Sequence, residues 1–410
     1  MASNITASAE RDVLVVGAGP AGSTTAALLA REGWRVTLLD RAAFPRDKAC
    51  SEYMSPAAVR VLDRLGVVAD LERAGAMPLA GTIVTADGGA QLHGRFAEAR
   101  PAPARPTGLS VSRRILDARL VDAARAAGAE VVERATVEEL LYDGGAVRGA
   151  LVRDAGGSRA ALHARLVVGA DGLRSLVARR LGARRQGPLR RVAFVAHVAG
   201  VPGLGASAEM HVGASGYVGI NPIGGGIANV ALVVPAREAR AAAGRAVDFF
   251  LERVDAFAGV RGRIGRDQIV RAVLVTGPFA ARASRVVADG ALLVGDAADF
   301  FDPFTGEGIC SALRGAELAA AHVGVALAGG GRVRAGALAG YRADRRRLFA
   351  GKWAVERLIG YAMCWPALFN RAVGRIGARP EMAHTLIGVT GNFLPAGSVL
   401  NPLFLTRMVF

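Results

Sequence analysis

The chain has 410 residues, of which 52% are hydrophobic and 21% charged. This length exceeds one simple core, so two closely packed domains are expected. The composition is that of a globular protein, which excludes a disordered chain. The net charge of +16 comes almost entirely from arginines scattered along the chain without interleaved aromatic residues, which argues against a nucleic-acid partner.

The N-terminal part of the chain predicts a strand–turn–helix–strand unit. Residues 12–16 are an apolar run, residues 17–22 a glycine turn, residues 23–32 a helix with small residues, and residues 35–39 a second strand. After this unit we expect helices at 56–65 and 112–127, an edge hairpin at 81–93, a proline-rich connector at 100–106, and strands at 130–133, 149–153, 161–165 and 166–172.

The middle of the chain changes character at residues 190–280. Glycine turns there separate expected antiparallel strands at 192–198, 208–212, 217–222, 228–234 and 270–275, with a helix at 246–260. A strand–turn–helix pattern returns at residue 291. After residue 341 the chain is mainly helical and ends in a segment, 390–410, that proline and glycine interrupt.

The turn at residues 17–22 has the GxGxxG pattern of a dinucleotide-binding loop. Gly17 permits a tight turn, Gly19 lets the backbone approach a pyrophosphate at the helix N-terminus, and Gly22 lets the helix pack close to the strand. Asp40 ends the next strand, where its carboxylate is expected to bind the adenosine ribose and to repel a 2′-phosphate, which leaves FAD or NAD. The expected contacts at this end are Gly17, Gly19, Pro20, Ala21, Gly22, Asp40 and Arg41.

Two later motifs distinguish FAD from NAD. Asp171 and Asp296 each follow an apolar strand, and an aspartate there can bind a ribityl hydroxyl. The Gly306–Gly308 turn opens a helix, whose N–H groups can stabilise negative charge on a reduced isoalloxazine ring. NAD has neither a ribityl chain nor this ring, so FAD is the expected cofactor. The contacts expected at this end are Asp171, Gly172, Gly295, Asp296, Pro303, Gly306, Glu307, Gly308 and Ile309.

In this order, GxGxxG, ArgxxLeuAsp at residues 113–117, Asp171-Gly172 and the glycine-rich motif at 295–308 resemble the group A flavoprotein monooxygenases and the geranylgeranyl reductases. These proteins share the para-hydroxybenzoate-hydroxylase-like fold. The resemblance spans about residues 10–345 and implies bound FAD with NAD(P)H as a transient electron donor. It also implies that Arg113 contacts the phosphate or ribityl region of FAD and that Asp171-Gly172 serves FAD and the nicotinamide donor. Residues 44–52 are similar to the FPRxKxCGE stretch of these proteins, with Ser51 in place of its glycine, and Cys50 is either a buried small residue or a neighbour of the flavin.

We therefore predict an α/β fold with a split Rossmann-type FAD-binding domain, an inserted antiparallel β-sheet substrate domain and a helical C-terminal region. The expected boundaries are 10–80, 107–185 and 285–345 for the FAD-binding domain, 81–106 with 186–284 for the substrate domain, and 346–410 for the helical region. The first 11 residues lack the apolar core of a signal peptide, and the three cysteines form no paired motif. A cytoplasmic protein without disulfides or a metal site is expected.

The reaction is less constrained than the cofactor. Residues 217–222 match the Tyr and Pro of the YxWxFP motif of archaeal-type reductases, but Gly219 and Asn221 replace its two aromatics and remove apolar groove wall. The favoured hypothesis is an NAD(P)H- and O2-dependent monooxygenase of secondary metabolism. It would hydroxylate an aromatic ring or quinone precursor through a flavin C4a-hydroperoxide. The candidate substrate-side residues are His211, Tyr217 and Asn221, with His197 as a further polar contact.

Other interpretations stay open. A protein similar to geranylgeranyl reductases would saturate prenyl double bonds, which the TGEG sequence at 305–308 favours, whereas an NAD-binding module would carry no flavin. Halogenation is disfavoured because the WxWxIP motif of halogenase relatives is absent. Trp353, Leu358, Tyr361, Trp365 and Phe369 form an apolar stripe at helical spacing, which is typical of core packing. Together with the basic charge, this stripe leaves peripheral membrane contact and a lipophilic substrate open.

Overall fold

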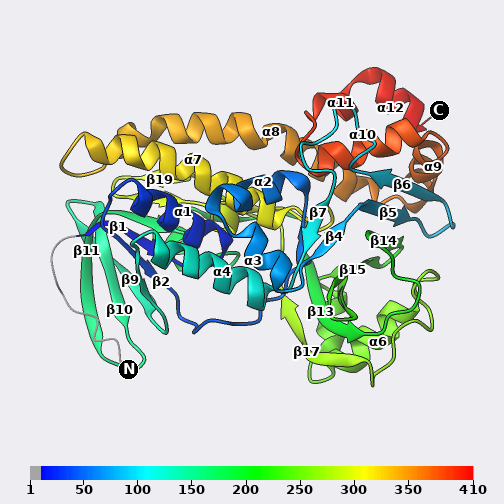
Figure 1. The fold of residues 1–410 in the computed structure, drawn as a ribbon, viewed down its shortest axis with the longest axis horizontal. Coiled ribbons are helices and arrows are strands. Elements are labelled where there is room, and N and C mark those ends of the chain that lie inside the picture. Colours follow the sequence, from blue (N-terminus) through cyan, green and yellow to red (C-terminus); the bar gives the residue numbers. More distant parts are fainter. Residues whose placement is uncertain (1–10, 410) are drawn as a thin grey trace.

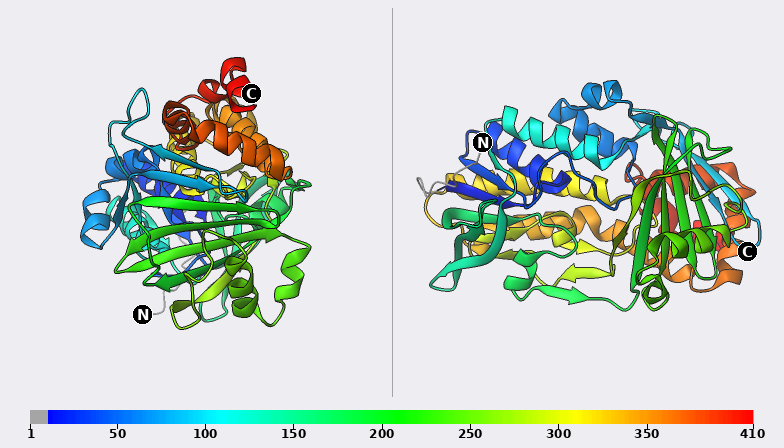
Figure 2. Two further views of the ribbon diagram at one scale, coloured as in Figure 1. Left: turned by 90° about the vertical axis from the view of Figure 1, so that its right-hand side faces the viewer. Right: turned by 90° about the horizontal axis from the view of Figure 1, so that it is seen from below.

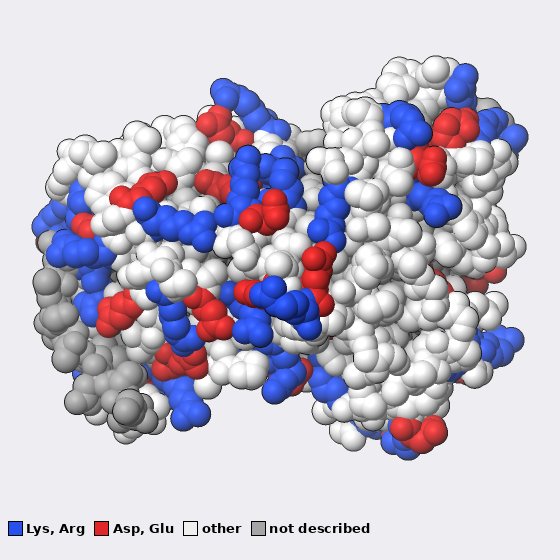
Figure 3. All heavy atoms as spheres, in the orientation of Figure 1, with Lys and Arg blue, Asp and Glu red and all other residues white. Residues whose placement is uncertain are grey.

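The computed structural model describes residues 11–409 as an elongated molecule with a large sheet toward each end (Figures 1 and 2). Residues 1–10 and Phe410 lie outside the described part of the chain. The expected domain limits at 10 and 410, and most of the segment in which we expect no signal peptide, therefore lie outside it as well. On the face drawn in Figure 3, basic and acidic side chains intermingle over much of the surface.

The first sheet begins with the N-terminal strand and has the order β19-β20-β11-β1-β2-β8 within residues 11–409, with β10 and β9 attached through β11. Its central strands run parallel. The strands are β1 (Arg11–Val16), β2 (Val36–Leu39), β8 (Glu130–Val132), β9 (Thr136–Asp143), β10 (Ala146–Arg153), β11 (Arg159–Gly169), β19 (Val287–Ala288) and β20 (Ala291–Leu293). A sheet that starts at residue 11 is thus completed by the strand at residue 291, as predicted.

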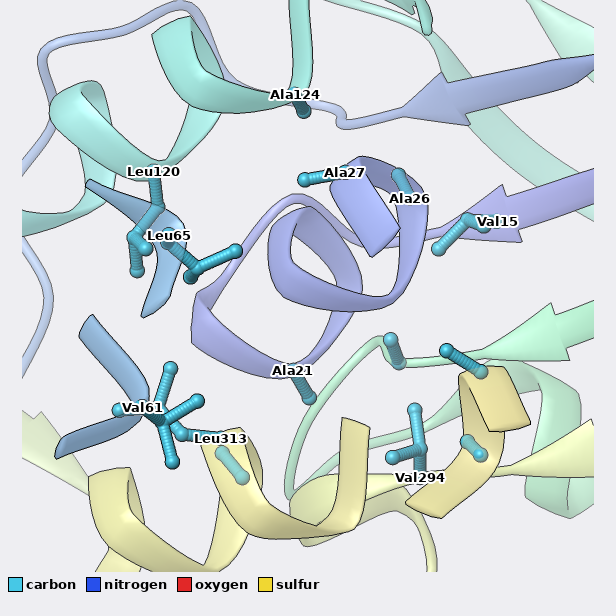
Figure 4. Packing of buried hydrophobic residues seen from close by; sticks show 14 of the residues in the cluster. Val15, Ala21, Ala26, Ala27, Val61, Leu65, Leu120, Ala124, Val294 and Leu313 are labelled. Carbon is cyan, nitrogen blue, oxygen red and sulfur yellow. The ribbon is translucent and has the colours of Figure 1, made fainter. Parts of the chain in front are cut away.

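Helices cover one face of this sheet. Figure 4 shows α1 (Pro20–Arg31) between α4 (Arg113–Ala126) and α7 (Gly308–Ala328), with the small side chain of Ala27 on the α4 side and that of Ala21 on the α7 side. Short side chains let these helices approach closely and exclude voids. The layer continues with α2 (Pro56–Leu65) and α3 (Val68–Arg73). The opposite face packs against the β9–β10 hairpin and α5 (Leu176–Arg180).

The second large sheet has the order β17-β13-β16-β15-β14-β5-β6. Its strands are β5 (Gly81–Thr85), β6 (Gln91–Arg95), β13 (Arg191–Ala199), β14 (Ser207–Gly213), β15 (Gly216–Gly224), β16 (Ile227–Pro235) and β17 (Ile269–Thr276). Among these described strands only β5 and β14 pair in parallel, which corrects the prediction of a wholly antiparallel insert. The two strands come from separate segments of the chain, so no hairpin constrains their direction. The outer face packs against α6 (Ala246–Asp255) and η1 (Glu238–Ala242).

Helix α8 (Ala339–Ala362) runs along the molecule toward the end at which α9 (Pro366–Gly377), α10 (Pro380–Thr390), α11 (Gly397–Leu400) and α12 (Pro402–Val409) lie beside the seven-stranded sheet (Figure 1). Helix α10 packs closely on β6, because a Cβ at Gly94 would lie 2.0 Å from the Ile387 side chain. None of the described helices is long and apolar enough to cross a membrane. The remaining elements are β3 (Tyr53–Met54), β4 (Met77–Leu79), β7 (Gly108–Ser110), β12 (Arg184–Gln186), β18 (Ala281–Ala283), β21 (Asp299–Phe300), η2 (Gly295–Ala297) and η3 (Ala335–Leu338).

Several predicted boundaries were wrong. Helix α1 begins at Pro20 rather than residue 23, because proline suits the first helical position and places Gly22 inside the helix. The two strands expected at 161–165 and 166–172 are one strand, β11, which pairs with β10 along its first half and with β1 along its second. Strand β9 was not predicted, and α6 ends at residue 255 rather than 260.

Candidate active site

A cavity lies between the carboxyl ends of the parallel strands and the inner face of the seven-stranded sheet, where open α/β folds bind ligands. It contains about 1370 Å³ of space that no atom fills, its open mouth included. The predicted residues that line it are Gly19, Pro20, Ala21, Cys50, Arg113, Gly172, Tyr217, Asn221, Asp296, Pro303, Gly306, Gly308 and Ile309. The predicted residues outside its lining are Gly17, Gly22, Asp40, Arg41, Asp171, Gly295, Glu307 and His211.

The glycine turn after β1 admits no larger residues at two positions. Gly17 has a φ of +100°, and a Cβ there would lie 2.6 Å from the carbonyl oxygen of Ala170 at the end of β11. A Cβ at Gly22 would lie 1.8 Å from the carbonyl oxygen of Gly17. The N-terminus of α1 is therefore held directly against the ends of β1 and β11.

Three cationic side chains gather where α1 opens the cavity. Arg113 donates to both carboxylate oxygens of the buried Asp117 at 2.7 Å, and Arg46 lies 3.0 Å from the same carboxylate. A Cβ at Gly19 would lie 3.7 Å from Arg113 and 3.9 Å from Arg46. Burial, and then the charge of Arg113, lowers the pKa of Lys48. These cations and the helix N-terminus make this end of the cavity suited to an anionic group.

Asp40 lies beside the glycine turn at the end of β2. Its carboxylate accepts hydrogen bonds from the Ala18 N–H at 2.8 Å and the Ala42 N–H at 2.9 Å. These bonds hold the carboxylate next to the first glycines of the turn, while Arg41 is exposed.

Asp171 caps helix α5 rather than lining the cavity. One carboxylate oxygen accepts from the Ser175 hydroxyl at 2.5 Å, and the other accepts from the Leu176 N–H at 2.6 Å. Burial raises the pKa of Asp171, and the hydrogen bond from Ser175 opposes that shift. Its neighbour Gly172 does line the cavity, with a φ of +74° and Lys48 close by.

The segment 295–309 forms the opposite wall of the cavity. Gly295 has a φ of +61°, and a Cβ there would lie 2.9 Å from Ala21 of α1. Burial raises the pKa of Asp296, an effect that the Lys48 ammonium opposes. Gly306 packs against the ring of Tyr53, and α7 begins at Gly308 with its N-terminus at the cavity. Backbone N–H groups are therefore available there to a ring bearing negative charge.

Glu307 lies in this turn, but its carboxylate contacts other parts of the chain. Its Oε2 accepts from the Ser55 hydroxyl at 3.1 Å and from the Asn392 amide at 2.7 Å, and Oε1 has no hydrogen-bond partner among the described residues. Burial raises the pKa of the Glu307 carboxyl to about 7. Glu307 thus ties the turn to α2 and to the C-terminal region.

Glu307→Gln is expected to flatten the pH dependence of stability. Between the ordinary pKa of 4.5 and about pH 7, the unfolded chain ionises at this residue while the folded protein keeps its proton. The unfolded state then binds fewer protons, so the wild type loses stability as the pH rises through this window and stays at the lower level above it. Urea unfolding across the window checks this. If the free energy of unfolding changed with pH by the same amount in the wild type and in Glu307→Gln, the prediction would be contradicted.

Tyr217 lines the cavity with its ring, but its hydroxyl is committed to a buried ion pair. The hydroxyl donates to Asp302 Oδ1 at 2.7 Å, and Arg191 donates to Asp302 Oδ2 at 2.8 Å. Burial, and then the charge of Asp302, raises the pKa of Tyr217 well above its ordinary value. The group therefore joins the seven-stranded sheet to the 295–309 wall and offers no free proton donor to a substrate.

The two histidines singled out in the sequence do not line the cavity. His211 lies on the opposite face of β14 from Met210, with its Nε2 3.0 Å from Glu209 Oε2, and Arg263 binds the same carboxylate. His197 Nε2 lies 2.7 Å from Glu52 Oε2 in a buried pair. Both histidines are thus partners of carboxylates in the fold.

Asn221 and Asn229 lie opposite each other on neighbouring strands at the cavity wall. Asn221 Nδ2 donates to Ser110 Oγ at 2.7 Å, and Asn229 Nδ2 donates to the Ser51 carbonyl at 3.0 Å. Because the carbonyl fixes which end of the Asn229 amide is the donor, Oδ1 is the free end. That oxygen is buried and has no hydrogen-bond partner among the described residues.

Sequence reasoning missed several residues of the cavity wall. Lys48 lies within the stretch similar to FPRxKxCGE and Tyr53 directly follows it, so their closeness to that motif was a usable signal. Asn229 was hidden in an apolar strand. Most of the remaining lining is apolar or small and carries no motif; it includes Ala193, Val195, Ala208, Met210, Ala231, Phe279, Phe300 and Phe304, with polar exceptions that include Glu209, Thr82 and Thr276.

Comparison with known proteins identifies the family to which this chain is related. Residues 10–355 match the model of the FAD binding domain family. The chain belongs to this family. The digeranylgeranylglycerophospholipid reductase of Methanoculleus marisnigri is 30% identical over 331 residues, 78% of each chain. The menaquinone reductase of Mycolicibacterium smegmatis is 32% identical over 325 residues, 75% of each chain.

Solved structures of other proteins share the fold of this chain. PqsL, described as a probable FAD-dependent monooxygenase from Pseudomonas aeruginosa, aligns with a TM-score of 0.71 at 25% identity, over 88% of this chain and 98% of that one. The predicted fold class, the resemblance to the superfamily of group A monooxygenases and geranylgeranyl reductases, and FAD as cofactor are confirmed. The protein is an FAD-dependent oxidoreductase.

The residues present fit FAD along the whole cavity. Gly19, Arg113 and Arg46 offer a backbone approach and two guanidinium groups to the pyrophosphate. At the other wall, the Gly306 turn and the N-terminus of α7 suit the flavin ring. Lys48 and Asp296 lie between these regions and have hydrogen-bonding groups for the linking chain.

Proposed function

We propose that this protein is a monooxygenase that uses FAD, NAD(P)H and O2 to hydroxylate an aromatic ring, such as that of a lipophilic quinone precursor. The observation that carries this proposal is the unpartnered Asn229 Oδ1 in a largely apolar cavity wall. A buried acceptor without a partner costs stability unless a ligand donates to it, and a phenolic hydroxyl is such a donor.

The shape of the wall around Asn229 supports a ring-sized substrate. Gly219 and Ala231 are adjacent on neighbouring strands of the inner face, and the thioether methyl of Met210 lies 3.4 Å from the position a Cβ at Gly219 would take, so this part of the wall is small and apolar. Phe300 and Phe304 contribute aromatic surface from the 295–309 wall. An aromatic ring can pack between these two walls while a hydroxyl on it reaches Asn229.

The residues of the chain would position the reactants and exclude water. The chemistry supplied by bound FAD would be hydride transfer from the nicotinamide and activation of O2. Arg113 and Arg46 would neutralise the phosphates, and the α7 N-terminus would stabilise negative charge on the ring system. The apolar wall would keep bulk water from the reacting atoms. Asn229 Oδ1 would accept a hydrogen bond from the phenolic hydroxyl and so orient the ring.

The decisive experiment measures the source of the added oxygen. Purified FAD-loaded protein is supplied with NAD(P)H, ¹⁸O2 and a panel of alkyl-substituted phenols and resorcinols, and products are analysed by mass spectrometry. One ¹⁸O atom per product and one O2 consumed per NAD(P)H are expected. A product that gains only two hydrogens, formed equally well without O2, would reject the monooxygenase.

That rejecting outcome is the second candidate, a reductase of prenyl double bonds. It is favoured by the reductase relatives and by the apolar walls of the cavity, which suit an isoprenoid chain. Turnover under strict anaerobiosis distinguishes the two, because only the reductase completes its cycle without O2.

Asn229→Leu is expected to weaken the binding of a phenolic substrate by about 10- to 100-fold, because the buried hydroxyl loses its acceptor. Asn221→Leu is the matched control, since it removes an amide from the same wall whose donor already serves Ser110. Titration of flavin absorbance or fluorescence measures both affinities. Equal losses in the two variants, or an equal loss for the O-methylated substrate, would contradict the role of Asn229.

A further inference from the structure

We propose that the corner between α8 and α9 docks on an anionic lipid bilayer. The contact surface, here called the corner patch, consists of Leu358, Tyr361, Trp365, Pro366, Ala367 and Leu368. This proposal does not depend on which flavin reaction the protein carries out.

The corner patch is apolar and open to solvent. Helix α8 ends at Ala362 and α9 begins at Pro366, so the corner patch lies at the connection between the two helices. Trp365 is 61% exposed, and Tyr361 and Leu368 are each 40% exposed. Leu358, Tyr361 and Trp365 are separated by three and four residues. Contiguous exposed side chains of this size mark an interaction surface, and Trp and Tyr are the residues that favour the membrane interface.

The charge around the corner patch selects an anionic partner. From residue 357 to the end of the chain, the sequence has five arginines and one acidic residue, Glu381. Arg357 and Arg371 are exposed and lie on either side of the patch along the chain. An apolar patch bordered by arginine is the arrangement of an interfacial segment on anionic lipids.

The corner patch also lies directly behind the wall of the active-site cavity. The rings of Tyr361 and Phe301 are 6.3 Å apart, and those of Phe369 and Phe304 are 6.5 Å apart. Phe304 lines the cavity, and Phe301 lies within the same 295–309 wall. A bilayer under the corner would therefore lie close to the cavity, where it can supply a lipophilic substrate. None of the described helices could span the bilayer, so the contact is peripheral.

The test is flotation of the FAD-loaded protein with phosphatidylcholine vesicles that do or do not contain phosphatidylglycerol. Binding is expected only to the anionic vesicles and should weaken as salt is raised. Trp365→Ser should lower the partition coefficient about tenfold, because it removes the largest inserted side chain. Val325→Ser is the matched control, since Val325 is 76% exposed on α7 away from the corner.

A second pair of variants tests the charge. Arg357→Gln with Arg371→Gln should reduce binding to anionic vesicles, whereas Arg342→Gln with Arg346→Gln, exposed at the other end of α8, should not. Circular dichroism and retained flavin verify folding of each variant. Binding that Trp365→Ser leaves unchanged would overturn the proposal. So would a dimer in solution that this substitution dissociates, because a second copy would then cover the patch.

Discussion

Gly22→Ala is expected to abolish FAD binding. A Cβ at this position would lie 1.8 Å from the Gly17 carbonyl oxygen and 3.1 Å from the Ala170 side chain. The obstructing atoms are backbone and buried, so α1 must move away from β1 and β11. The N-terminus of α1 would then lose the close approach to the pyrophosphate that Gly19 allows. We expect a purified variant without absorbance at the flavin wavelengths, and a free energy of unfolding lower by about 1–3 kcal/mol from overpacking alone.

Gly336→Ala separates this effect from the general cost of replacing glycine. Gly336 lies in η3 with no atom within 4 Å of the position its Cβ would take. It should keep full flavin content and wild-type stability. If Gly22→Ala retained as much flavin per protein as the wild type, FAD binding would not depend on the close approach of α1 to β1.

Arg191→Met is expected to be the most destabilising substitution outside the glycine turn. It leaves Asp302 buried without its cationic partner, and removing one member of a buried ion pair costs about 3–5 kcal/mol. The loss should extend beyond stability. The Asp302 carboxylate also accepts a hydrogen bond from the Tyr217 hydroxyl at the cavity wall, and Arg191 donates to the Gly360 carbonyl, so β15, the 295–309 wall and α8 all depend on this ion pair.

A double-mutant cycle isolates the coupling. Arg191→Met combined with Asp302→Leu removes both charges and should recover part of the loss, since no buried charge remains. Arg347→Met at the exposed Arg347–Asp344 pair serves as the control and should change the free energy of unfolding by no more than about 0.5 kcal/mol. Urea unfolding of the FAD-loaded proteins measures the free energy of unfolding of the wild type, of each single variant and of the double variant. Additive losses in the double variant would show that Arg191 and Asp302 are not coupled.

The cofactor-binding half of the molecule could be predicted from the sequence because the residues that form it lie in short, recognisable segments of the chain. Gly17 and Gly22 are demanded by backbone geometry within six residues, and the strand and helix on either side are visible as hydrophobic periods. The later glycine motif at 295–308 follows the same logic. Asp171 shows the limit of such reasoning: the motif was visible, but its carboxylate caps α5, a partner that lies four to six residues downstream.

The substrate side depended on contacts between distant segments. The Arg113–Asp117 pair could be expected from one helix turn, whereas the partners of Tyr217 and Asn229 come from residues 302 and 51. No local pattern predicts that Tyr217 is committed to an ion pair or that Asn229 keeps a free oxygen.

The split α/β fold and the FAD site could be predicted from short segments, because backbone turns and hydrophobic periods are local properties of the chain. Which polar side chains reach the cavity depends on how distant segments pack together. Successive residues of a strand point to opposite faces, so Met210 and not His211 faces the cavity, and the Glu209–Arg263 contact that holds His211 away joins residues 54 positions apart. Which face is buried is set by what packs on it, and that is a property of the whole chain.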